Sequence, residues 1–292
     1  MRIFVVTRKT LLIAAAAAAA LIAAVVLAVS LGGGKASAAG AASNNSKQAV
    51  VQTAAERNEL PLLAGESSEY ELEVLAGFKK ELPVYSVERS DNKIALTIDA
   101  AWDDDKTPFI LETLKRYNVK ATFFLCGSWV RSYPDMVKAI SDAGHSIGNH
   151  SLTHPHMSKI SGEKIIEEID ELDDLLEKIT GKRTVLFRAP YGEYNDNVIK
   201  TVRSSGHEPI QWDVDTIDWK PERSSQTILN TVLPKIKNGS IILCHNNGYK
   251  IEEYLPTLIE TAQANGFAFA TVDELLLSGE TIIDVNGVQK QK

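Results

Sequence analysis

The chain has 292 residues, of which 44% are hydrophobic and 24% charged, enough for one globular domain with a remainder. The formal net charge is −7. Because the first 39 residues carry four positive charges and no negative one, the rest of the chain carries about −11 (−7 minus +4). An acidic body without a basic cluster argues against a nucleic-acid partner, whose phosphates attract Lys and Arg.

The amino-terminal segment, residues 1–39, is typical of export. Basic residues precede residues 11–31, in which only Ser30 is not apolar. At about 1.5 Å per residue, a helix of this length just spans a hydrocarbon core. Residues 36–38 read Ala-Ser-Ala, an A-x-A cleavage signal. We expect either an uncleaved membrane anchor or a cleaved signal peptide, and in both cases an extracytoplasmic protein, membrane-anchored or secreted.

The remaining chain divides by composition. Residues 40–90 are predicted to be a linker and amino-terminal extension, with candidate strands at 69–75 and 82–87. Residues 91–278 have the regular pattern of a folded domain, and 279–292 are assigned to a carboxyl-terminal tail.

From residue 93 onward, short β-rich runs alternate with amphipathic helical runs. Seven strands alternating with six helices predict an α/β fold with a mainly parallel sheet, closed or nearly closed into a barrel. The strands are expected at 94–99, 121–126, 146–150, 185–188, 208–213, 240–245 and 267–271. The helices are expected at about 107–117, 130–143, 161–180, 195–205, 224–237 and 253–264.

The helix at 161–180 has the clearest signals. It has Ser161 as amino-terminal cap, Gly181 as stop, and one apolar stripe. The members of that stripe are Ile165, Ile166, Ile169, Leu172, Leu175, Leu176 and Ile179.

The two cysteines, Cys126 and Cys244, lie in strand-like apolar runs. Two buried small hydrophobic residues are the preferred interpretation, with a disulfide as the alternative. The chain has no CxxC or zinc-finger spacing.

Ionisable residues follow five of the predicted strands. They lie at Asp99, in GNHSLTH (148–154), in FRAPYG (187–192), in WDVDTIDW (212–219) and in LCHNN (243–247). In barrels of parallel strands, function sits at the carboxyl ends of the strands. We therefore expect these side chains to meet at one rim.

Two histidines, His150 and His154, are four residues apart. In a turn of helix their rings would share a face and could present two nitrogens to one metal. Two His with one carboxylate would leave open positions, as a catalytic zinc-type site requires. Alone, this spacing is more often a solvated or core-satisfied pair; the metal interpretation gains weight from the carboxylate cluster at a neighbouring position of the rim. His156 is interpreted as a bystander, and His145 and His207 are given no role.

The order of the Asp loop, HSLTH, RAPY, DxxDW and LCH closely resembles the NodB-homology domain of the carbohydrate esterase family 4 polysaccharide deacetylases, over roughly residues 90–275. The resemblance implies a distorted (β/α) barrel of about seven parallel strands. It also implies removal of N-acetyl groups from amino sugars of chitin-like or peptidoglycan chains, with a bound divalent metal.

The resemblance further implies roles for four residues at the metal. His150 and His154 match the family's metal ligands, and Asp99 matches its catalytic base. Arg188 matches the arginine that orients this base, a role suited to a bidentate guanidinium.

Other roles concern the substrate. Tyr191 matches the residue whose backbone N–H stabilises the oxyanion, and His245 the acid that protonates the leaving amine. Leu243 and Trp219 match the pocket for the acetyl methyl, and one of Asp215 and Asp218 would hold His245 or Arg188. The residues assigned to substrate binding are Trp219, Leu243, Asp215 and Asp218.

The chain departs from the family pattern at the first motif. The family usually reads TFDDG, in which the second Asp binds metal, whereas this chain reads TIDAA, with Ala100 at that position. Within the cluster 103–105, Asp104 or Asp105 is the predicted surrogate ligand. The stretch resembles the IDAAW variant of some family members.

Several functional alternatives stay open. The first is a metal-dependent N-deacetylase of a cell-wall polysaccharide, peptidoglycan or chitin-like, with zinc as the expected metal and cobalt or nickel also suitable. The second is a non-catalytic glycan-binding module with a degenerate metal site, and the third is a deacylase of another ester or amide. We expect a monomer that contacts the membrane through its amino-terminal segment and its extracellular glycan substrate through the rim.

Overall fold

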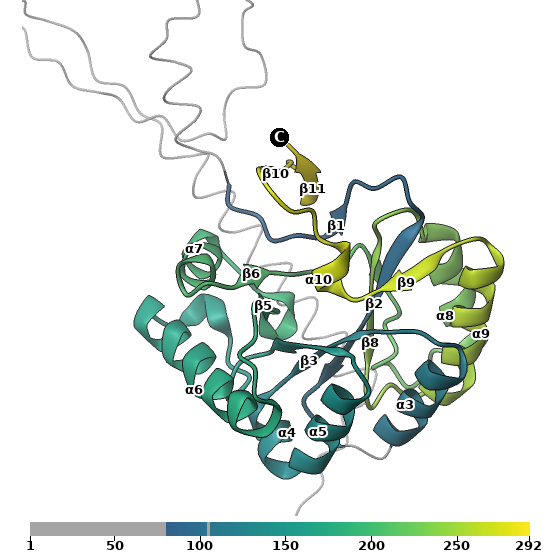
Figure 1. Ribbon diagram of the computed structural model, residues 1–292, viewed down its shortest axis with the longest axis horizontal. Helices are drawn as coiled ribbons and strands as arrows, with labels where there is room; N and C mark the ends of the chain where they lie inside the picture. The colour runs from purple at the N-terminus through teal and green to yellow at the C-terminus, as the bar shows by residue number, and fades with distance from the viewer. Residues whose placement is uncertain (1–79, 104–105) are drawn as a thin grey trace, which may run out of the picture. The chain divides into compact units, whose positions relative to one another are not determined.

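The computed structural model describes residues 80–103 and 106–292 (Figure 1). The predicted export segment, most of the linker, the candidate strand at 69–75, Asp104 and Asp105 lie outside the described residues. Within the described residues, no helix combines the length and apolarity needed to cross a bilayer.

The central sheet is parallel throughout, as the alternating pattern predicted. Seven strands lie side by side in the order β6-β5-β4-β3-β2-β8-β7, and β9 pairs with β2. The strands are β2 (Lys93–Ala100), β3 (Thr122–Leu125), β4 (Ser146–Asn149), β5 (Leu186–Phe187), β6 (Glu208–Pro209), β7 (Val214–Asp215), β8 (Ile241–His245) and β9 (Ala268–Ala270).

The sheet curls into a half-barrel, and the connection between its two edge strands shows why. β6 and β7 are at opposite ends of the row, yet only residues 210–213 separate them in the chain. Such a short segment can join the two edges only if they lie close together. The sequence predicted one long strand at 208–213, but β6 ends at Pro209 and the chain crosses to pair β7 with β8. The predicted (β/α) barrel fold is confirmed.

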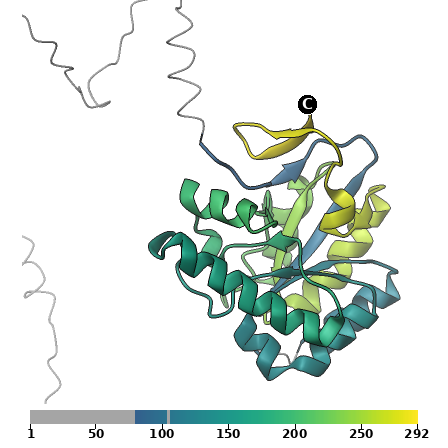
Figure 2. The ribbon, with the colours of Figure 1, turned by 60° about the vertical axis from the view of Figure 1, so that its left-hand side comes forward.

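Helices cover the outer face of the sheet (Figures 1 and 2). Side chains such as Ile98 and Phe123 from the strands pack with Leu172 and Leu258 from the helices in the largest core cluster. The helices are α3 (Thr107–Arg116), α4 (Gly127–Ser132), α5 (Pro134–Asp142), α6 (Gly162–Thr180), α7 (Asp196–Ser204), α8 (Ser225–Val232), α9 (Ile251–Ala264) and α10 (Val272–Leu275), with single 3-10 turns η1 (Met157–Lys159), η2 (Pro190–Gly192) and η3 (Leu233–Lys235).

Proline explains two differences from the predicted helices. The helix expected at 130–143 is two helices, because Tyr133, which precedes Pro134, has φ −131° and ψ 53° and cannot continue α4. The helix expected at 224–237 ends at Val232, and η3, which contains Pro234, follows it.

Helix α6 begins and ends as predicted. The Ser161 side chain accepts a hydrogen bond from the Lys164 amide, and Gly181 ends the helix with φ 75°. Ile166 was wrongly placed on the buried stripe, since it is 38% exposed. It lies about 100° around the helix from Ile165. Both cysteines are free and buried, as preferred from the sequence.

A second, three-stranded sheet contains the predicted tail. It has the order β1-β11-β10, with β1 (Ser86–Val87), β10 (Thr281–Ile283) and β11 (Val288–Gln291). Residues 279–292 are therefore not a simple tail, because β11 pairs with β1 from the beginning of the domain. Ser86 also bridges to Ser240, just before β8, so this sheet lies at the amino-terminal ends of the barrel strands (Figure 2).

Gly239 joins the two sheets and provides a test of the fold. Its φ is +78°, and a Cβ there would lie 1.6 Å from the Val87 carbonyl oxygen. Gly239→Ala should therefore lower the free energy of unfolding by roughly 2–4 kcal/mol, from left-handed strain plus overpacking. Urea denaturation of the full chain measures this. Gly181→Ala is the matched control, because its φ is +75° with no atom within 4 Å of the added Cβ; it should cost only about 1 kcal/mol. Equal losses would contradict the proposed contact.

Candidate active site

The carboxyl ends of the strands surround one cavity of about 510 Å³. Eight of the side chains that the sequence assigned to the site line it, and two more, Arg188 and Asp218, lie buried behind it. The eight are Asp99, His150, His154, Tyr191, Asp215, Trp219, Leu243 and His245. Parallel strands bring these residues together from positions nearly 150 apart in the chain.

Asp99, the predicted base, forms a buried ion pair with Arg188. Arg188 Nη1 lies 2.7 Å from Asp99 Oδ1 and 2.8 Å from Thr97 Oγ1, and Nη2 donates to the Gln211 carbonyl at 3.0 Å. Burial disfavours the charge on Asp99, but the attraction of Arg188 and then of the imidazoles outweighs it, so the pKa of Asp99 lies below its usual value. Asp99 is therefore held as a carboxylate facing the cavity.

The Arg188 guanidinium itself is wholly buried between two aromatic rings. Its central carbon lies 4.1 Å from the centroid of Phe124 and 5.4 Å from that of Trp212. Cation–π contacts and three hydrogen-bonded neighbours therefore fix the plane of the group. Arg188 is therefore not part of a surface ion pair, which is the ordinary role of an arginine.

His150 and His154, the predicted metal ligands, lie at the end of β4 with ring centroids 5.0 Å apart. His150 Nδ1 lies 2.8 Å from the Arg188 carbonyl oxygen, which can only accept, so Nδ1 carries the proton and the Nε2 lone pair faces Asp99 Oδ2 at 3.7 Å. Burial lowers the pKa of both imidazoles, for His154 to about 4. Both rings are thus neutral at pH 7, the form that binds metals.

Of the three predicted metal ligands, the two histidines, His150 and His154, are placed as a metal site requires. In the described part of the chain, His154 Nδ1 is buried without a hydrogen-bond partner, and an unpartnered ring nitrogen beside the His150 ring suits a cation. The described residues do not gather three metal-ligating side chains. Ala100 cannot serve, since it continues β2 with its methyl in the core. The predicted third ligands, Asp104 and Asp105, are outside the described residues.

The described start of that loop is anchored beside the site. Asp103 has a left-handed φ of 49°, and its carbonyl accepts hydrogen bonds from Trp129 Nε1 at 2.6 Å and Asn246 Nδ2 at 2.5 Å. The preceding Trp102 packs its ring edge-on to His154, with centroids 4.8 Å apart. Asp103, the last described residue before the gap, is therefore anchored by Trp129 and Asn246, and its neighbour Trp102 lies against His154.

His245, the predicted acid, is paired with Asp218. His245 Nδ1 lies 2.7 Å from Asp218 Oδ1, while Asp218 Oδ2 accepts hydrogen bonds from the His245 amide at 3.1 Å and the Tyr254 hydroxyl at 2.6 Å. Gly248 passes so close that a Cβ there would lie 2.2 Å from Asp218 Oδ2. Burial opposes the charge on His245, but Asp218 outweighs it and raises its pKa.

The two aspartates of the fifth segment have different positions. Asp218 is fully buried and holds His245, so its assignment to substrate contact is corrected. Asp215 is the one of the pair that lines the cavity, where it accepts a hydrogen bond from Trp212 Nε1 at 3.2 Å. Burial raises the pKa of Asp215. Of the two aspartates that the sequence offered as the partner of His245, the structure therefore selects Asp218.

Exposed aromatic rings form the mouth of the cavity. Trp102, Tyr191 and Trp219 are each more than half exposed, and Leu243 lies deeper. Tyr191 has a left-handed φ of 59°, and its ring stacks on His156 at 4.5 Å between centroids. His156, interpreted as a bystander, therefore supports the mouth. Flat apolar rings around a polar floor suit the faces of sugar rings.

Three residues near the site were missed in the sequence. Trp102 stands within the IDAAW stretch itself, which was the available signal. Tyr254 on α9 and Glu168 on α6 had no comparable signal in the sequence. The position of Tyr254 is typical of a core residue, and that of Glu168 is typical of the solvated face of a helix. Only the fold brings their polar groups to Asp218 and to the HSLTH turn.

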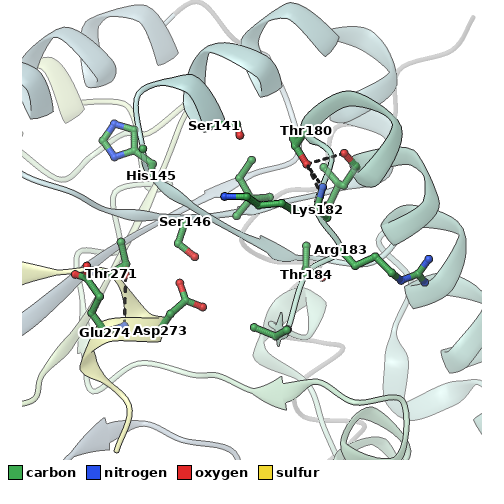
Figure 3. Close-up of a pocket in the computed structure, with 14 residues that line it drawn as sticks. Ser141, His145, Ser146, Thr180, Lys182, Arg183, Thr184, Thr271, Asp273 and Glu274 are labelled. Atoms are coloured by element: carbon green, nitrogen blue, oxygen red, sulfur yellow. Dashed lines mark hydrogen bonds between the residues drawn. The ribbon is translucent and has the colours of Figure 1, made fainter. Parts of the chain in front are cut away.

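A second cavity, of about 340 Å³, lies at the opposite end of β4 (Figure 3). Ser146, the first residue of β4, and Thr184, two residues before β5, line it together with Lys182 and Asp273. Arg183 points away toward Asp174 on α6. None of the side chains predicted to act in the site lines this cavity.

Comparison with known proteins assigns the family. The family profile described as polysaccharide deacetylase matches residues 86–210. A peptidoglycan-N-acetylglucosamine deacetylase of Bacillus cereus is 36% identical over 187 residues, which cover 63% of this chain and 68% of that protein. The uncharacterized protein YlxY of Bacillus subtilis is 36% identical over 195 residues, 66% of this chain, and the match covers only 60% of YlxY.

Solved structures agree with this assignment. Wild-type BA3943 of Bacillus anthracis, described as a CE4 family pseudoenzyme, aligns with a TM-score of 0.63 at 36% identity, covering 66% of this chain and 68% of that one. A BA3943 mutant described as having restored enzymatic activity aligns with the same TM-score at 37% identity, covering 66% and 70%. The chain belongs to the polysaccharide deacetylase family, carbohydrate esterase family 4, as its motifs predicted.

The Asp99–Arg188 pair provides a stability test. Asp99→Asn leaves the buried guanidinium without its counter-charge, and it should lower the free energy of unfolding by roughly 3–5 kcal/mol. Urea denaturation measures the loss. The double variant Asp99→Asn/Arg188→Met should recover part of it, because the unpaired charge is gone. A double variant less stable than Asp99→Asn would count against the pairing.

The His245–Asp218 pair predicts a pH dependence. Asp218→Asn should lower the pKa of His245, as read from its imidazole resonances in an NMR titration. Because the folded pKa is raised, the stability from this pair is fully present below the unfolded value of about 6.5 and is lost as pH rises through the folded pKa. The difference in free energy of unfolding between wild type and Asp218→Asn should therefore become smaller as the pH rises. Asp215→Asn is the control and should shift the pKa of His245 less. An equal shift would argue against the direct hydrogen bond between His245 and Asp218.

Proposed function

We propose that the protein is a metal-dependent hydrolase that removes N-acetyl groups from amino sugars of a cell-wall polysaccharide, with peptidoglycan as the first candidate. The observation that carries this proposal is the convergence of three units on one cavity. These are the Asp99–Arg188 pair, the facing imidazoles of His150 and His154, and the His245–Asp218 pair. A module that only binds glycans has no need for all three.

Each unit has a chemical task in amide hydrolysis. Asp99, kept ionised by Arg188, accepts a proton from the attacking water. His245, whose protonated form Asp218 stabilises, gives a proton to the leaving nitrogen as the C–N bond breaks, so that acetate and a free amine result. The Tyr191 backbone N–H would donate to the oxyanion, and Leu243 with Trp219 would hold the acetyl methyl.

His150 and His154, with Asp104 or Asp105, would hold the metal. Bound there, a divalent ion would polarise the acetamide carbonyl and make water more acidic. Zinc suits this donor set best, and cobalt or nickel also suit it. The neutral imidazoles and the orphaned His154 Nδ1 support this assignment.

The substrate class follows from relatives and from the amino terminus. A Bacillus cereus relative is named as a peptidoglycan-N-acetylglucosamine deacetylase. The apolar stretch at 11–31 predicts export, which would bring the cavity to the wall side of the membrane. Whether glucosamine or muramic acid is the substrate sugar is open to test with defined glycans.

A second candidate is a non-catalytic wall-glycan-binding module. Ala100 supports it, since a methyl group buried in the core replaces the carboxylate expected there. The similarity to BA3943, described as a pseudoenzyme, supports it as well. The two candidates differ in whether residues 104–105 supply the missing ligand.

The deciding measurement is metal content and acetate release from N-acetylated peptidoglycan and chitooligosaccharides. We expect about one metal per chain in the wild type, reduced by His150→Ala and by one of Asp104→Ala and Asp105→Ala. Asp99→Asn, measured on folded protein, should retain metal yet lose activity by about 10²–10⁴-fold, because the base is removed while both imidazoles remain. No acetate with any divalent ion, together with retained binding to insoluble peptidoglycan, would leave the second candidate.

A further inference from the structure

The HSLTH turn, residues 150–154, has an unfavourable backbone. Ser151 has φ 64° and His154 has φ 60°, although neither is glycine. The left-handed conformation costs an ordinary residue roughly 1–2 kcal/mol. Contacts from elsewhere in the fold must therefore hold the turn that carries both imidazoles.

Three of these contacts come from one residue of α6, Glu168. The Thr153 amide donates to Glu168 Oε2 at 2.7 Å, and the Thr153 hydroxyl donates to Glu168 Oε1 at 2.7 Å. The Leu152 amide donates to the Glu168 backbone carbonyl at 3.1 Å. Glu168 thus accepts three hydrogen bonds from the two residues that directly precede His154.

The Glu168 carboxylate is itself unusual. It is 1% exposed, and in the described part of the chain no Lys, Arg or His forms an ion pair with it. Burying a carboxylate without a counter-charge is costly unless its oxygens receive strong hydrogen bonds. Both carboxylate oxygens accept hydrogen bonds from Thr153. The contacts that offset the cost of burying Glu168 are therefore the same ones that hold this turn.

A neighbouring contact fastens the other end of the turn to the same helix. Asn149 Nδ2 donates to the Ile169 carbonyl at 2.9 Å and to Asp173 Oδ1 at 3.0 Å. Asn149 Oδ1 accepts from the Ser151 amide at 2.9 Å. The His154 amide donates to Ser151 Oγ at 3.0 Å, so the two ends of the turn are tied to each other, and Glu168 holds the two residues between them, Leu152 and Thr153.

We infer that Glu168 is a positioning residue for the metal site: its buried carboxylate clamps Thr153 and thereby fixes the backbone from which His154 points at His150. Without the clamp, Ser151 and His154 relax toward ordinary φ values, and the second imidazole leaves its place. The part of this inference that concerns metal rests on the proposed function, whereas the part that concerns the turn does not.

Three variants of the full chain, purified in detergent, test the inference. Glu168→Ala removes the clamp. Glu168→Gln keeps its geometry without charge, because the amide oxygen accepts from the Thr153 N–H and the amide nitrogen donates to the Thr153 hydroxyl. Glu171→Ala is the control, the same change at an exposed position of the same helix.

The first measurement is amide hydrogen exchange, which needs no metal. In Glu168→Ala, exchange at Leu152 and Thr153 should rise at least about tenfold relative to the core amide of Ile98, as local opening requires. Glu168→Gln should stay within about threefold of wild type, and Glu171→Ala should match it. Unchanged exchange at Thr153, or an equal rise at Ile98, would overturn the inference, since the effect would then be absent or merely global.

The second measurement is Co²⁺ affinity by spectrophotometric titration. Loss of a residue that orients a ligand typically weakens metal binding by about 10–100-fold, which is expected for Glu168→Ala but not for Glu168→Gln. Wild-type affinity in Glu168→Ala would overturn the inference. If the wild type itself binds no Co²⁺, the proposed metal dependence fails, and the exchange result alone decides whether Glu168 holds the turn.

Discussion

The buried pair of Arg188 and Asp99 is the interaction on which the rest of the site depends. The Arg188 side chain extends from the end of β5 to Asp99 and Thr97 on β2, while the Gln211 carbonyl on the β6–β7 connection accepts a hydrogen bond from Nη2. The carbonyl of the same residue fixes the tautomer of His150. One arginine therefore sets the charge of the predicted base and the donor atom of a predicted ligand. Such a group can be buried only because every neighbour is already in place.

The same principle recurs at two further carboxylates around the cavity. Asp218 is buried beneath His245 and receives the Tyr254 hydroxyl, and Glu168 is buried beside the HSLTH turn and receives both donors of Thr153. In each case a helix of the outer layer reaches through to the rim and orients a residue on a strand end. The helices thus do more than cover the apolar face of the sheet, because they also fix the directions of the polar side chains inside it.

The short β6–β7 connection makes these arrangements compatible. It brings the two edges of the curled sheet together, so that Asp215 at the β7 edge lies close enough to Arg188, which follows β5, to attract its charge. The cavity is open only at its mouth, where Trp102, Tyr191 and Trp219 are exposed. The choice between a deacetylase and a glycan-binding relative then depends on a small part of the chain. Ala100 lies in the core, so β2 lacks the carboxylate that the family pattern places at this position.

The sequence alone determined the features that depend on neighbours in the chain. The alternation of strands and helices, the cap at Ser161, the stop at Gly181 and the rim position of the motif residues were all predictable, because periodicity and capping are local. The tertiary structure decided whatever joins distant segments. It selected Asp218 over Asp215 as the partner of His245, and it paired the carboxyl-terminal strand β11 with β1. It also gave Glu168 and Tyr254 their polar contacts. Local patterns cannot encode these choices, because they depend on which buried donor and acceptor the packed barrel finally brings within hydrogen-bond distance.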